Sequence, residues 1–172
     1  MAGGRRRRAG RAGAGSDGGA EGLADLARAK VAERKPLEAI ALFARYLSFR
    51  PNDATALAEF AKLLVARVER PDATRRDRAW AYDALEAAVS RNPTDRWLRS
   101  TLADYMLRSG RFGAAGEQLD ILLDGDSSSS ADGDTEEPED RTELLLMRAR
   151  AYLGTGNYRE AAELLAGICS FD

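Results

Sequence analysis

The chain has 172 residues, a formal net charge of −2, 44% hydrophobic residues and 31% charged residues, which suits one globular domain or a short repeat array. It has no histidine and one cysteine, Cys169, so Ser-His-Asp and Cys-His catalysis, an internal disulfide and a thiolate metal cluster are excluded. No apolar run approaches the roughly 20 residues that a membrane span needs. Catalysis by carboxylates or lysine stays possible, and the single cysteine suits a reducing, cytoplasmic location.

Two segments have compositions that favour disorder. Residues 1–22 are rich in arginine and glycine and carry no large apolar residue after Met1, so we expect a disordered basic tail. Its run Arg5–Arg8 could be a nucleic-acid arm, a localisation signal or simply a solvated tail. Residues 124–140, "DGDSSSSADGDTEEPED", hold acids and no base, and we expect an acidic disordered loop. Asp-x-Asp spacing suits calcium, but the helix-loop-helix calcium pattern is not matched, so no metal site is predicted.

The rest of the chain shows helical apolar spacing and an internal repeat. Small residues recur at spacings of 12, 20, 12 and 12 within successive helix pairs, and at 34, 42 and 46 between first helices. The basic unit is therefore 34 residues, with insertions near 69–77 and in the acidic loop. The first-helix markers are Ala27, Ala61, Ala103 and Ala149, and the second-helix markers are Ala39, Ala81, Ala115 and Ala161. We expect helix breaks near 34–36, 50–53, 70–74, 91–95, 109–111, 124–141 and 155–157.

The sequences around these markers resemble the tetratricopeptide repeat family. "GTGNYREAAELL" and "KPLEAIALFARYLSFRPND" are similar to its second helix, with a small residue, a large residue four positions later and a closing proline. Two departures are Arg148, where leucine or phenylalanine precedes the other first-helix alanines, and Pro36, where an aromatic residue is usual. The resemblance implies an all-α, right-handed superhelix of about four antiparallel helix pairs. The units would be about 20–53, 54–95, 96–129 and 142–172, within a repeat domain over 23–172.

The two proline-containing joints agree with this interpretation. "RPND" and "RNPTD" each place a proline after one helix and an aspartate before the next. Proline cannot continue the hydrogen-bonding pattern of a helix, and aspartate is a favoured N-cap. The competing interpretation is an irregular helical bundle with an alanine-rich interior. We further expect Trp80 in the core, and we expect Trp97 either to anchor a ligand or to pack across the joint between units.

The resemblance implies a non-catalytic scaffold that binds a peptide or partner helix in a concave groove lined by the first helices. The expected groove residues are Arg28, Lys62, Trp97, Asp104 and Arg150. Because three of the four residues that follow the first-helix alanines are basic, the partner is possibly acidic. A small-molecule substrate, a cofactor and a membrane are not expected.

Three alternatives stay open. The chain could be a regulatory or accessory portion of a larger protein whose catalytic part lies elsewhere, or an RNA-binding helical repeat. Leu165 and Ile168 would also lie on an uncovered edge of the last helix. That edge indicates either further repeats or a homodimer.

Overall fold

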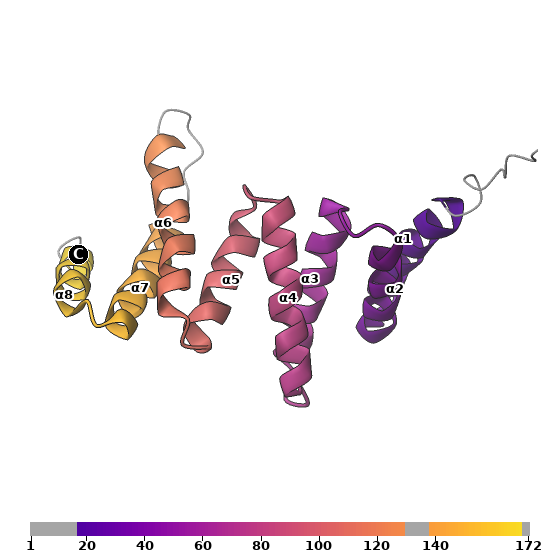
Figure 1. Ribbon diagram of the computed structural model, residues 1–172, viewed down its shortest axis with the longest axis horizontal. Coiled ribbons are helices and arrows are strands. Elements are labelled where there is room, and N and C mark those ends of the chain that lie inside the picture. The colour runs from indigo at the N-terminus through magenta and orange to yellow at the C-terminus, as the bar shows by residue number, and fades with distance from the viewer. Residues whose placement is uncertain (1–16, 130–137, 170–172) are drawn as a thin grey trace, which may run out of the picture. The chain divides into compact units, whose positions relative to one another are not determined.

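The computed structural model describes residues 17–129 and 138–169, and these contain eight α-helices and no strand. The helices are α1 (Asp17–Ala32), α2 (Pro36–Phe49), α3 (Ala54–Val68), α4 (Arg75–Arg91), α5 (Arg96–Arg108), α6 (Phe112–Ser129), α7 (Pro138–Thr155) and α8 (Tyr158–Cys169). The predicted all-α fold is confirmed, and the short breaks between helices fall where the sequence indicated them (Figure 1). None of the helices in these residues combines the length and the apolar character that crossing a membrane demands.

The small residues that mark the repeat are all buried. Each has at most 2% of its surface exposed: Ala27, Ala39, Ala61, Ala81, Ala103, Ala115, Ala149 and Ala161. A methyl side chain lets two helix backbones approach closely, which is why the same position recurs in every helix. The marker register read from the sequence is therefore confirmed.

The chain divides into two compact units, Met1–Ala56 and Leu57–Asp172, which are described separately. In the first unit, α1 and α2 form an antiparallel pair around Ala24, Ala27 and Ala39. The turn between them places Arg34 in the left-handed region, at φ 58°, while the Lys35 amide donates to the Lys30 carbonyl and closes the end of α1.

The first unit also contains the joint predicted from "RPND". The Asp53 carboxylate accepts hydrogen bonds from the Ala56 amide at 3.0 Å and from the Tyr46 hydroxyl at 2.5 Å. Asp53 is thus the N-cap that the sequence indicated for the first turn of α3. Tyr46 adds a bond from the preceding helix, so one carboxylate ties the two sides of the joint together.

In the second unit, α4 packs against α5, α5 against α6, α6 against α7 and α7 against α8. α3 joins this unit through the ring of Phe60, which meets Trp80 of α4 edge-on at 5.4 Å. One part of the core is the cluster of Ala103, Leu119, Leu122 and Leu144, which lies where α5, α6 and α7 meet. Trp80 was expected in the core, but 39% of its surface is exposed.

Side-chain caps explain where two of these helices begin. Thr74 and Asp77 form a reciprocal capping box at α4, with bonds of 3.1 Å and 2.8 Å. Asp95 accepts from the Leu98 amide at 3.0 Å at the start of α5, as "RNPTD" predicted. Both caps satisfy amides that have no partner inside the helix.

Three helix ends lie inside segments predicted to be disordered. α1 begins at Asp17, α6 continues to Ser129 and α7 begins at Pro138. Adding a residue to an existing helix costs much less than starting one, so α6 extends past its buried turn despite a serine-rich sequence. Proline suits the first turn of α7 because its missing amide hydrogen is not needed there. Residues 1–16 and 130–137, the rest of the two segments, lie outside the described residues.

Candidate binding groove

The second unit contains a groove of about 910 Å³. It is lined almost entirely by the first helices of successive pairs, α3, α5 and α7, as the repeat arrangement implies. The lining residues are Val65 and Val68 of α3; Glu69, directly after α3; Arg96, Trp97, Ser100, Thr101, Asp104, Tyr105 and Arg108 of α5; Leu122 of α6; and Glu143, Leu144, Met147 and Arg150 of α7.

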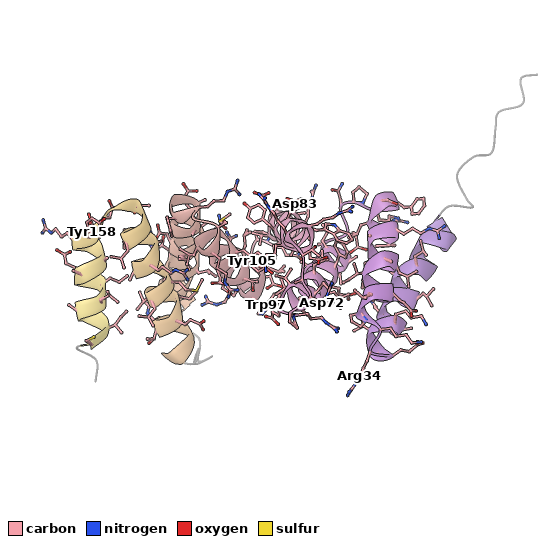
Figure 2. All side chains as sticks on the ribbon, turned by 90° about the horizontal axis from the view of Figure 1, so that it is seen from below. Arg34, Asp72, Asp83, Trp97, Tyr105 and Tyr158 are labelled. Atoms are coloured by element: carbon pink, nitrogen blue, oxygen red, sulfur yellow. The ribbon has the colours of Figure 1, made fainter. Side chains whose placement is uncertain are left out.

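Two aromatic residues of α5, Trp97 and Tyr105, line the groove, and both are labelled in Figure 2. Trp97 has 42% of its surface exposed, although the Lys62 ammonium of α3 lies over its ring at 5.3 Å from the centroid. Trp97 of α5 therefore lines the groove and also contacts α3 through Lys62. Tyr105 is half-buried, and burial raises the pKa of its hydroxyl, so it remains a neutral hydrogen-bonding group at physiological pH.

The charges that line the groove balance. Three bases, Arg96, Arg108 and Arg150, face three acids, Glu69, Asp104 and Glu143. The Arg108 guanidinium donates to the Asp104 carboxylate at 2.6 Å, so this pair neutralises itself. The balance differs from the mostly basic groove expected from the residues that follow the first-helix alanines, because Glu69 and Glu143, which do not follow those alanines, also line the groove.

Three of the five residues expected in the groove line it: Trp97, Asp104 and Arg150. Lys62 lies beside the lining, over the Trp97 ring. Arg28 belongs to α1 in the other unit, where its guanidinium lies 3.2 Å from the Asp25 carboxylate.

Sequence reasoning missed several lining residues, notably Tyr105, Arg108, Glu143 and Met147. A helical-face argument extended by one turn would have found Arg108, because it follows Asp104 by four residues on the same side of α5. Glu143 lies too close to the segment predicted to be disordered to have been considered.

A buried arginine fixes α5 against its neighbours. Arg99 has only 8% of its surface exposed, and it donates to Gln118 Oε1 of α6 at 2.6 Å and to the Pro93 carbonyl at 2.7 Å. A guanidinium can donate in a fixed planar fork, so the two bonds set the orientation of α5 relative to both α6 and the joint before it. The groove residues of α5 are held by this arrangement.

A second arginine fixes α7. Arg148 Nη2 donates to Asp120 Oδ2 of α6 at 2.8 Å, Nε lies 2.7 Å from Oδ1 as an ion pair, and the guanidinium stacks at 4.0 Å on the Tyr152 ring. A β-carbon at Gly116 would overlap this guanidinium, so the glycine leaves room for it. The contact between Arg148 and Asp120 positions α7 against α6. Met147 and Arg150 of α7 line the groove. Among residues 17–129 and 138–169, no three acidic or cysteine side chains are grouped so that they could hold a metal ion.

No family model matches the chain, and no curated protein matches it. Solved structures do match it. MamA 41-end from Desulfovibrio magneticus RS-1 is 14% identical, with a TM-score of 0.59 over 89% of this chain and 75% of that one. Another MamA crystal structure is 16% identical, with a TM-score of 0.61 over 90% and 80%.

The nearly identical TPR-like repeats of a Podosopora anserina protein described as a kinesin light chain also match, at 21% identity. Their TM-score is 0.56, over 88% of this chain and 74% of that one. At these identities the likeness concerns the fold, and it agrees with the repeat spacing and the buried alanines. The chain has a tetratricopeptide-type helical repeat fold.

Proposed function

We propose that the groove of the second unit binds a segment of a partner protein, and that the chain is a non-catalytic interaction scaffold. The observation that carries this proposal is the groove itself: about 910 Å³, lined by three first helices, with an exposed tryptophan at its surface. Tryptophan and tyrosine are the side chains that most often dominate the energy of protein interfaces.

The chemistry of the lining favours an amphipathic segment. Trp97, Tyr105, Leu144 and Met147 offer apolar surface, whereas the surrounding charges have both signs. A helix or extended peptide with apolar side chains and flanking residues of both charges would meet each kind of surface. The acidic partner expected from the sequence draws its support from Arg150 alone, which makes no ion pair within the described part of the chain. A cytoplasmic location is part of the same proposal.

The test uses two tryptophan variants with matched exposure. Trp97→Ala removes the groove surface, whereas Trp80→Ala removes a tryptophan of similar exposure that does not line the groove. Proteins captured from the native extract by the wild-type chain and by Trp80→Ala, but not by Trp97→Ala, are the candidate partners. The segment of each that binds is then identified as a synthetic peptide and titrated by calorimetry.

We expect Trp97→Ala to weaken peptide binding by on the order of tenfold or more, since truncating a central aromatic residue costs about 2 kcal/mol or more. Equal affinities for the two tryptophan variants would refute the groove as the binding site. A partner that instead reacts chemically in the presence of the chain would overturn the non-catalytic assignment.

A further inference from the structure

The contact between α6 and α7 shows how one first helix sits on the second helix before it (Figure 1). The contacting residues occupy defined repeat positions. Arg148 directly precedes the buried Ala149, and it reaches Gly116 and Asp120, which follow the buried Ala115 by one and five residues. The second helix thus receives the incoming side chain between its positions one and five after the alanine.

α8 presents the same face with nothing of the described chain covering it. Its positions one and five after Ala161 are Ala162 and Ala166, and both are exposed. Leu165, four residues after Ala161, is half-buried, whereas its counterpart in α6, Leu119, is completely buried. The α8 edge, defined here as Ala162, Leu165, Ala166 and Cys169, is therefore an apolar surface shaped to receive a first helix.

α1 presents the complementary side chain. Leu26 directly precedes the buried Ala27, so it occupies the position of Arg148, and 47% of its surface is exposed. The equivalent Leu102 of α5 is only 3% exposed. The exposed residues of α1 and of the α8 edge are each described within their own unit. In both, a leucine is more exposed than its equivalent inside the repeat array: Leu26 compared with Leu102, and Leu165 compared with Leu119.

We propose that the chain associates head to tail, with α1 of one copy packing on the α8 edge of another copy. Leu26 then lies over Ala162 and Ala166, as Arg148 lies over Gly116 and Asp120. The match is apolar on both sides, because alanines replace the glycine and aspartate that accommodate the guanidinium. The contact uses different surfaces on the two copies, so it leaves one surface of each kind open and can continue beyond a dimer. It is independent of the groove.

The first experiment transfers the Arg148–Asp120 pair to this contact. Sedimentation velocity of the full chain over a range of concentrations should show species larger than a dimer. Leu26→Arg and Ala166→Asp should each weaken association by on the order of tenfold or more, because each places a charge against an apolar surface. Adding Ala162→Gly to these two substitutions should restore association, since the triple variant recreates between copies both the ion pair that joins α6 and α7 and the space that Gly116 leaves for the guanidinium.

The control is the double variant with Leu26→Asp and Ala166→Asp, which places like charges together and should stay dissociated. Leu146→Asp, at a residue of α7 with 48% exposure, should associate like the wild type. A wild-type chain that stays monomeric at all concentrations would overturn the proposal. So would association that Ala166→Asp abolishes and Leu26→Arg leaves unchanged, because that result would indicate two α8 helices paired with each other.

A cross-linking experiment keeps the proposal testable if a variant folds poorly. Cys169 is exposed and is equivalent to Leu123 of α6, which packs against the cluster that contains Leu144 of α7. Gly22 is the α1 equivalent of Leu144, and a β-carbon there meets nothing within 4 Å. Gly22→Cys should therefore form ladders of cross-linked species with a short bismaleimide, whereas the wild type should not. Dimers in the wild type and no ladder in Gly22→Cys would refute the head-to-tail contact.

Discussion

Leu102 of α5 and Arg148 of α7 occupy equivalent positions in the repeat, yet one is apolar and the other is charged. Leu102 is 3% exposed and needs only apolar neighbours. Arg148 has 16% of its side chain exposed and is accommodated by three separate features, the Asp120 carboxylate, the Tyr152 ring and the space above Gly116.

The difference teaches that the repeat specifies a volume at this position and not a residue type. An arginine can fill a place between helices when its charge is paired and its stem is packed. The cost is that several neighbouring residues must change with it. Sequence comparison with the family pattern marked Arg148 as a departure, while the structure shows a coordinated replacement.

The largest expected effect is the difference in unfolding free energy lost when Leu102 and Arg148 are each replaced by alanine. Leu102→Ala should lower the free energy of unfolding by about 2–5 kcal/mol, because it leaves a cavity among buried residues. Arg148→Ala should cost about 1 kcal/mol, since Asp120, whose side chain is half exposed, regains water when its partner is removed. Urea unfolding followed by circular dichroism measures both. Equal losses would mean that the two positions are energetically alike.

The next prediction tests the buried marker alanine, a feature that every helix pair of the repeat has in common. Ala115→Leu should cost about 1–3 kcal/mol, because the added atoms overpack a site that is completely buried. Ala114→Leu, one residue earlier at a half-buried position, is the control and should cost less. A neutral Ala115→Leu would show that the marker alanine does not define the close approach of the helices.

The marker alanines and the joints at Asp53 and Asp95 could be predicted because they depend on local chemistry, namely a small residue at fixed spacing and a capping carboxylate. The long end of α6 could not, because its helix is propagated from a buried turn and its own composition favours a loop. The burial of Arg99 was also not predictable. It depends on Gln118 and the Pro93 carbonyl, which only the tertiary structure brings within 2.7 Å.

For the groove, sequence reasoning could name residues of the right helix face but not the charge balance. Asp104 and Arg150 follow the marker alanines, so periodicity located them. Glu69 and Glu143 enter the lining only through the way in which α3 and α7 are placed beside α5. The net charge of a surface built from three helices depends on that placement.

A smaller effect concerns the energetic coupling between Arg148 and Asp120. The double-mutant cycle of Arg148→Met and Asp120→Ala should show a coupling of about 1 kcal/mol, in the range found for contacting residues. The double variant should be nearly as stable as the wild type, because replacing both partners removes the charge and its need for compensation together. The cycle for Leu102→Ala with Asp120→Ala is the control, and we expect it to be closer to additive. Zero coupling for the first cycle would mean that the ion pair contributes only packing.

The smallest effect concerns the joint at Asp53, which, unlike the cap at Asp95, also binds a tyrosine. Hydrogen bonds from the Ala56 amide and the Tyr46 hydroxyl lower the pKa of Asp53 below its usual value. A carboxyl group with a lowered pKa in the folded state stabilises that state above its unfolded pKa of about 3.9, and this stabilisation is lost as the pH falls through the folded value. Asp53→Asn keeps an oxygen that can cap the helix but cannot titrate, so the difference in unfolding free energy between wild type and variant should be largest near neutral pH and shrink below about pH 4. Urea unfolding from pH 7 to pH 3 measures this difference, with Tyr46→Phe as a partial variant that removes only the hydroxyl. A difference that stays constant over this range would show that the charge of Asp53 makes no contribution to the joint.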